Sequence, residues 1–232
     1  MEFVAGLPQV QRGRRYCYIH KGNAKRGVDT EQTVRTKGFD APVRVKRDGT
    51  YKIKGGQTVY LCLSSDFLLE DAGLWREECW AMIRRRPDLH FLFLTKRIHR
   101  FLERVPSDWD QGYDNVTVGC TVEDQASADT RLPLFARLPI KHRNIICQPL
   151  IVPVNLERYL DGVELVVVGG ESDPGARPLD YAWVLSIREQ CIRQGVHFEF
   201  RQCGTHFIKD GKTYTLPVRE LCSQARKANI NC

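Results

Sequence analysis

The chain has 232 residues, of which 42% are hydrophobic, and it carries a formal net charge of +7 and nine cysteines. This length and composition favour one mid-sized domain with a sizeable core. The sequence holds no run of about 18 apolar residues, which argues against a membrane span, and its first residues lack the apolar segment of a secretion signal. The cysteines form no C-x2-C pair, so we expect scattered thiols in a reduced, cytoplasmic protein.

Short apolar segments alternate with longer stretches along the chain. The apolar segments are residues 58–65, 90–97, 116–124, 144–150, 164–172 and 197–204. Their apolar residues are continuous rather than alternating, as in parallel strands buried on both faces. Helical patterns follow them, for example after the first, second and fourth segments. The sequence therefore predicts a parallel α/β fold in a single domain over residues 1–232, either a full or partial TIM-type β/α barrel or a doubly wound sheet.

Two segments outside this pattern carry turn signals. Residues 44–58 predict an exposed hairpin or loop with a turn at Asp48-Gly49. Residues 205–232 predict a C-terminal extension with a turn at Asp210-Gly211 and a polar helix. Basic residues are spread along the whole chain, so the net charge permits a nucleic-acid partner without requiring one. Five cysteines in apolar surroundings are predicted core thiols: Cys62, Cys79, Cys120, Cys147 and Cys191.

Polar residues follow each apolar segment. In parallel α/β folds the carboxyl ends of the strands bind ligands, because loops and helix N-termini converge there. Helix capping is the alternative explanation for single Ser, Asp and Thr residues. The predicted binding residues are Ser64, Asp66, Thr95, Lys96, Arg97, Glu123, Gly169, Gly170, Glu171, Ser172, Arg177 and Arg201.

Three of these groups predict specific contacts. Lys96 and Arg97 suit a phosphate or a carboxylate. Gly169 and its neighbouring glycine would let the backbone approach a ligand closely. Glu171 would hold a ribose hydroxyl or an amine, or else form a structural ion pair with Arg177.

Five strings resemble a phage-associated bacterial family of unknown biochemical function. They are LTKR (94–97), VGCTVEDQ (118–125), PLIVPVNL (149–156), VVGGESDPGARP (167–178) and WVLSIREQC (183–191). The resemblance implies a TIM-type barrel with a three-cysteine motif similar to that of radical S-adenosylmethionine enzymes. Such a motif would hold three irons of a [4Fe–4S] cluster and leave the fourth for S-adenosylmethionine. The implied partners are a small-molecule or nucleic-acid substrate and a protein encoded by a neighbouring gene.

The N-terminus departs from that family pattern. Only Cys17 matches a cluster cysteine, whereas Leu7 and Arg14 stand where the other two belong. Gln148 occupies a position where the family usually has a glutamate, and Arg201 one where it usually has a lysine. If the codons of residues 1–13 are read one base later, they can encode WNLWQGCHKYSEG, which matches the family motif. We therefore hypothesise that residues 1–16 are a frameshifted metal-binding segment, and that the chain as written has too few thiolates to hold a cluster.

Two other interpretations remain open at this point. In a cluster-free barrel, Lys96, Arg97, Arg177 and Arg201 would form a basic pocket for a nucleotide or a nucleic-acid end. In a zinc protein, two C-x2-H pairs would meet in a four-ligand site. These pairs are Cys17 with His20 and Cys203 with His206.

Overall fold

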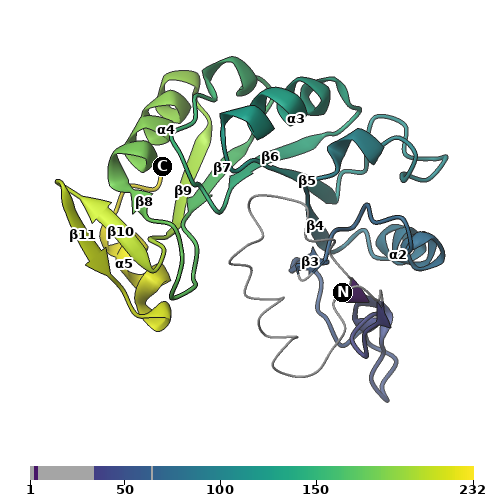
Figure 1. Ribbon diagram of the computed structural model, residues 1–232. Helices are drawn as coiled ribbons and strands as arrows, with labels where there is room; N and C mark the ends of the chain where they lie inside the picture. Colours follow the sequence, from purple (N-terminus) through teal and green to yellow (C-terminus); the bar gives the residue numbers. More distant parts are fainter. Residues whose placement is uncertain (1–2, 5–33, 64) are drawn as a thin grey trace.

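The computed structural model describes residues 3–4, 34–63 and 65–232, and its main sheet has six parallel strands. Each strand pairs with the next one along the chain, in the order β3-β4-β5-β6-β7-β9. The sheet curls into a half-barrel (Figure 1), in which β3 and β9 are the edge strands. The strands are β3 (Thr58–Leu61), β4 (His90–Thr95), β5 (Val116–Thr121), β6 (His142–Cys147), β7 (Leu165–Gly169) and β9 (His197–Gln202). All six predicted strands are thus confirmed in a partial barrel.

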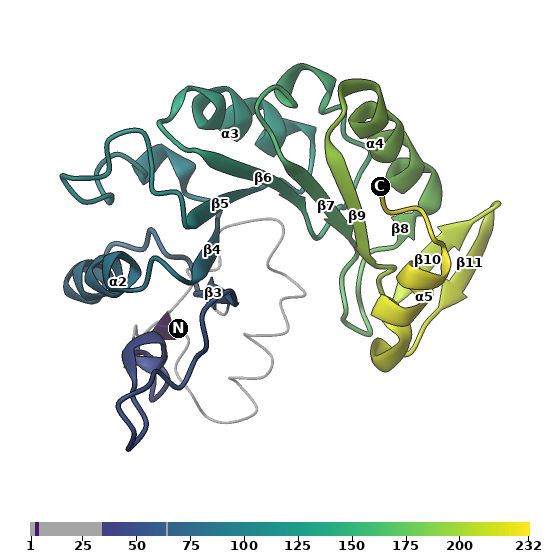
Figure 2. The same ribbon diagram turned by 180° about the vertical axis from the view of Figure 1, so that it is seen from behind.

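Three long helices lie on the convex side of the sheet (Figures 1 and 2). They are α2 (Gly73–Arg85), α3 (Gln125–Arg137) and α4 (Tyr181–Gln194). The predicted helices after β4 and β6 are instead the single-turn 3-10 helices η3 (Ile98–Arg100) and η4 (Glu157–Tyr159). A residue that disfavours helix continuation follows each of them: Pro106 after η3, and Gly162, with φ +67°, after η4. The sequential strand order, with helices on one side, excludes a doubly wound sheet for the described residues.

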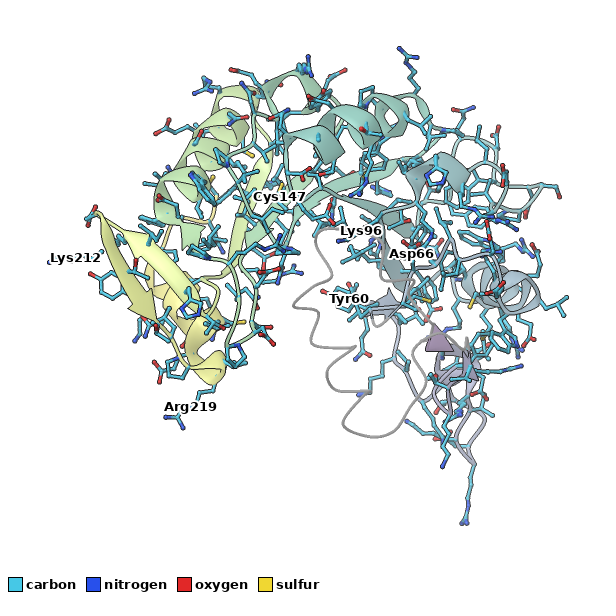
Figure 3. All side chains as sticks on the ribbon, in the orientation of Figure 1. Tyr60, Asp66, Lys96, Cys147, Lys212 and Arg219 are labelled. Carbon is cyan, nitrogen blue, oxygen red and sulfur yellow. The ribbon has the colours of Figure 1, made fainter. Side chains whose placement is uncertain are left out.

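The hydrophobic core lies between the sheet and these helices. Phe91 and Phe93 on β4 are fully buried and belong to this core, as does Trp80 of α2. Side chains alternate along each strand, so the residues between them face the concave side. Tyr60 lies on that side in Figure 3 and is 45% exposed. All five predicted core thiols are buried: Cys62, Cys79, Cys120, Cys147 and Cys191.

Each of the two predicted turn segments contains a hairpin. In the first, Val45 pairs with Tyr51, and Gly49 adopts φ +82° in the turn. In the second, β10 (His206–Lys209) pairs with β11 (Lys212–Thr215), and β10 also pairs with β8 (Leu179–Asp180). The helix α5 (Leu221–Lys227) then packs beside β9, where Cys232 and Phe198 exchange backbone hydrogen bonds.

The remaining elements are short. β1 (Phe3–Val4) pairs with β2 (Val34–Arg35), and two further 3-10 helices are η2 (Ala41–Val43) and η5 (Val218–Glu220). None of the helices in the described part of the chain has the length and apolar character needed to cross a membrane.

Candidate functional site

Apart from Ser64, the predicted binding residues lie at or just after the carboxyl ends of the strands, at one edge of the half-barrel. Figure 3 places Asp66, after β3, close to Lys96, after β4. Because the strands are parallel and adjacent, residues far apart in the sequence are brought together at this edge.

Asp66 joins the ends of β3 and β4. Its buried carboxylate accepts hydrogen bonds from the hydroxyl of Thr95 at 2.9 Å and from the backbone N–H of Lys96 at 3.0 Å. A third bond comes from the backbone N–H of Leu68 at 3.0 Å, and the guanidinium of Arg97 lies 3.4 Å away. Four interactions occupy this carboxylate, so Asp66 and Thr95 position the loop after β4.

Glu123, after β5, holds two cations. Lys96 donates to one of its carboxylate oxygens, and Arg131 of α3 donates to the other at 2.7 Å. Arg131 also donates to the carbonyl oxygen of Thr121 at 2.6 Å, which fixes the guanidinium at the end of β5. The Glu123 side chain is only 5% exposed, whereas that of Lys96 is 18% exposed. Lys96 can therefore present its remaining N–H donors to a ligand while Glu123 neutralises its charge.

Glu171, after β7, pairs with Arg177. The guanidinium Nε donates to the carboxylate at 3.1 Å, Nη2 donates to the other oxygen, and the Arg177 backbone N–H donates at 2.9 Å. Of the two contacts predicted for Glu171, the structure contains the ion pair. The pair closes residues 171–177 into a compact loop at the mouth of the half-barrel.

Packing explains the paired glycines. A Cβ added to Gly170 would lie 2.7 Å from the Cα of Gly204 and 2.8 Å from the carbonyl oxygen of Cys203. A Cβ added to Gly169 would lie 3.0 Å from the side chain of Gln148. The neighbours are parts of this chain, so β7 and β9 approach each other through these glycines. Ser172, the next polar residue, is partly buried.

Arg201, on β9, pairs with Glu199 on the same face of the strand. Its Nε and Nη2 donate to the two carboxylate oxygens at 3.0 and 2.9 Å. These bonds raise the pKa of Arg201 above its ordinary value.

The four cations predicted to form a basic pocket therefore each have a carboxylate partner. The partners of Lys96, Arg97 and Arg177 are almost completely buried, at 4–6% exposure, and the cations are more exposed, at 15–30%. Buried carboxylates hold the cations in place, so the edge is a rigid array of ion pairs rather than a surplus of positive charge.

Sequence reasoning missed Arg131 and Glu199. Strand alternation would have placed Glu199 beside Arg201, two residues away on the same face. Arg131 lies on the second turn of α3, whose N-cap is Asp124, and this position faces the preceding strand end. Neither residue belongs to a local polar cluster, which is the pattern used to find the others.

The structure does not favour the zinc site. The Cys203 thiol is buried, and burial raises its pKa to about 11. The ring nitrogens of His206 bond the carbonyl oxygen of Pro174 at 2.9 Å and the hydroxyl of Thr215 at 3.4 Å. Within residues 3–4, 34–63 and 65–232, no three His, Cys, Asp or Glu side chains are arranged to hold a metal ion. Ser64 and the four N-terminal residues predicted or discarded as ligands (Leu7, Arg14, Cys17 and His20) lie outside the described residues.

The comparison with protein families covers almost the entire chain. Residues 2–229 match a family described as "Protein of unknown function (DUF5131)". The chain belongs to this family. The match begins at residue 2 and so extends over the segment that contains Cys17. Comparisons with curated proteins and with solved structures found no match.

Proposed function

We propose that this member of the family is a cluster-deficient relative of radical S-adenosylmethionine proteins that keeps a ligand site at the carboxyl edge of its half-barrel. On this proposal the half-barrel is a partial TIM-type barrel, the protein is cytoplasmic and phage-associated, and its further partner is a protein encoded nearby. The observation that carries the proposal is the set of buried carboxylates holding partly exposed cations at the strand ends.

This arrangement suits a small ligand with a carboxylate. Lys96 has three ammonium donors and uses one for Glu123. A charge-assisted hydrogen bond from Lys96 to a ligand carboxylate would be strong in this partly buried setting. The methionine carboxylate of S-adenosylmethionine is such an acceptor. Because each cation is already paired with a carboxylate, the site would pay a smaller desolvation cost when a zwitterion binds.

The residues of the chain do not fit a [4Fe–4S] cluster. Three thiolates are needed in one loop, and the sequence as written has Cys17 alone in that region. Cys120 and Cys147, at the ends of β5 and β6, are buried, and burial raises the pKa of Cys120 to about 12. We therefore derive no electron transfer or radical step for this chain.

The alternative proposal is a cluster-free site for a nucleotide or a nucleic-acid end. It would use Lys96, Arg97, Arg177 and Arg201 as phosphate ligands. Since every one of these cations already has a carboxylate partner, a phosphate would have to compete with it. This competition makes a carboxylate ligand of lower charge the better match.

Calorimetric titration of the full chain with S-adenosylmethionine tests the proposal, with AMP and ATP as comparison ligands. We expect binding of S-adenosylmethionine that Lys96→Gln weakens about tenfold or more, as for loss of a charged hydrogen bond. Lys96→Gln should fold, because Glu123 keeps Arg131 as its partner. Lys141→Gln is the matched control, since Lys141 forms an exposed ion pair with Asp114 away from the strand ends. Binding of ATP but not of S-adenosylmethionine would support the alternative, and binding of neither would overturn both.

Anaerobic iron–sulfur reconstitution tests the frameshift. The chain as written is compared with a version whose first fourteen residues are replaced by WNLWQGCHKYSEGC. We expect about four irons per chain in the repaired version alone. Iron in neither version would exclude descent from a cluster protein.

A further inference from the structure

Residues 44–54 form a projecting, strongly basic hairpin that is separate from the strand-end site. The segment contains Arg44, Lys46, Arg47, Lys52 and Lys54 and one acidic residue, Asp48, so it carries a formal charge of +4 within a chain of +7. The hairpin is therefore a local excess of positive charge. Figures 1 and 2 show this loop extending away from β3 and α2.

The hairpin is rigidly built. Lys46 N–H donates to the carbonyl of Thr50 at 2.8 Å, and Gly49 N–H donates back to the carbonyl of Lys46 at 3.1 Å. With Gly49 at positive φ, this is a three-residue loop that ends in a glycine bulge. Asp48 accepts bonds from the backbone N–H and the hydroxyl of Thr50 at 2.9 and 2.7 Å. The one carboxylate of the segment is thus used inside the turn.

A buried arginine fastens the hairpin to the body of the protein. The guanidinium of Arg86 lies 4.0 Å from the centre of the Tyr51 ring and donates to the carbonyl of Ile53 at 2.8 Å. Arg86 also donates to Asp88 and to the carbonyl of Pro42. Tyr51 therefore turns one side of the ribbon toward the body, while Val45, its partner in the ladder, is 50% exposed.

The cations lie on the opposite face. Lys46 and Lys52 lie on the face of the ladder opposite Val45 and Tyr51, as does Arg44, whose guanidinium pairs with Asp40 at 2.6 Å. Lys46, Arg47, Lys52 and Lys54 are exposed and form no ion pair within the described residues. Unlike the cations at the strand ends, they carry uncompensated charge. Such a surface attracts a polyanion.

We infer that residues 44–54 are a docking ribbon for duplex DNA that binds through phosphate contacts. The major groove of B-form DNA, about 12 Å wide, admits a two-stranded β-ribbon, whereas that of an RNA duplex is too narrow for side chains to read. A membrane surface fits less well. The tip residues Arg47, Asp48 and Gly49 are polar, and interfacial binding needs apolar or aromatic side chains there.

Fluorescence anisotropy of the full chain with a labelled 20-base-pair duplex tests this inference over a range of KCl concentrations. The test variant is K46Q/R47Q/K52Q/K54Q. The matched control, K209Q/K212Q/R226Q/K227Q, removes four exposed cations at the other end of the molecule and leaves the same net charge. Neutralising four phosphates gives a slope of log K against log salt of about −3.6, or about a 100-fold loss of affinity between 50 and 200 mM salt.

We expect the test variant to lose about this much of the slope and at least tenfold in affinity at 50 mM KCl, while the control changes little. A second variant, K46E/K52E, checks the result with fewer substitutions, and circular dichroism verifies the fold of each. Equal losses in test variant and control would mean that only the net charge matters and would overturn the inference. Tighter binding to RNA duplexes or to phosphatidylglycerol vesicles, or no binding at 50 mM KCl, would also overturn it.

Discussion

The hydroxyl of Thr95, the last residue of β4, donates a hydrogen bond of 2.9 Å to the carboxylate of Asp66, which follows β3. The two residues are thereby locked at the edge where ligands are expected, and the same carboxylate receives the backbone N–H of Lys96. Thr95 thus provides a structural contact, and Lys96, the next residue, provides a candidate ligand contact. Perturbing Asp66 should affect stability first and binding through Lys96 second.

Asp66→Ala should lower the free energy of unfolding by about 3 kcal/mol, because it leaves the partly buried Arg97 without its ion-pair partner. Urea denaturation measures this. Asp114→Ala is the control, since Asp114 forms an exposed pair with Lys141. The control should unfold at the urea concentration of the parent. Equal midpoints for all three proteins would show that the Asp66 network contributes no stability.

Gly170→Ala should destabilise the protein by roughly 2 kcal/mol, because the added methyl group would overlap backbone atoms of Cys203 and Gly204. Gly73→Ala, at the start of α2, has no atom within 4 Å of the added Cβ and should leave stability unchanged or slightly increase it. Thermal unfolding of both variants separates the two effects. A Gly170→Ala protein as stable as the parent would contradict the close approach of β7 and β9.

Stability should fall as the pH rises above about 9. Burial raises the pKa of Cys120 to about 12, from an ordinary value near 9. Between these values the unfolded chain has lost the thiol proton and the folded chain has kept it, so the unfolded state binds fewer protons and is favoured by rising pH. The contribution of Cys120 is thus fully present below pH 9 and is lost toward pH 12.

Urea midpoints between pH 8 and 10.5 test this behaviour. Each pH unit above pH 9 costs about 1.4 kcal/mol for one such thiol, so between pH 9 and 10.5 Cys120→Ala should reduce the decline in unfolding free energy by about 2 kcal/mol. Cys222→Ala should leave the decline unchanged, because Cys222 is exposed. The same slope in the parent and in Cys120→Ala would rule out a thiol that stays protonated through burial.

Arg86→Lys should loosen the basic hairpin. A lysine cannot stack on the Tyr51 ring while also bonding Asp88 through two nitrogens and the carbonyl of Ile53. We expect trypsin to cut within residues 44–54 several-fold faster, with the products identified by mass spectrometry. Arg85→Lys is the control, since Arg85 makes a single 3.2 Å bond to the Tyr51 hydroxyl. Similar rates in both variants would show that Arg86 does not hold the hairpin.

Local patterns in the sequence predicted much of the fold. The six strands were found because short, continuous apolar runs of β-forming residues are typical of parallel strands buried on both faces. The turns at Asp48-Gly49 and Asp210-Gly211 were found because both glycines must adopt positive φ. The core thiols were found from their apolar neighbours. Each of these features depends on residues only a few positions apart.

Only the tertiary structure decided how the polar residues are used. The sequence determined that charged residues follow the strands, but Lys96 and Glu123 are 27 residues apart, and Thr95 and Asp66 are 29 apart. Their pairing depends on which strands are neighbours and on their register. The same dependence decided that Gly170 packs against Gly204 and that the connections after β4 and β6 are single turns rather than helices. Hydrophobic periodicity in the sequence indicates which face of an element is buried. The partner of a charged side chain depends instead on the three-dimensional arrangement of the strands, because ion pairs form between residues that are close in space and not in sequence.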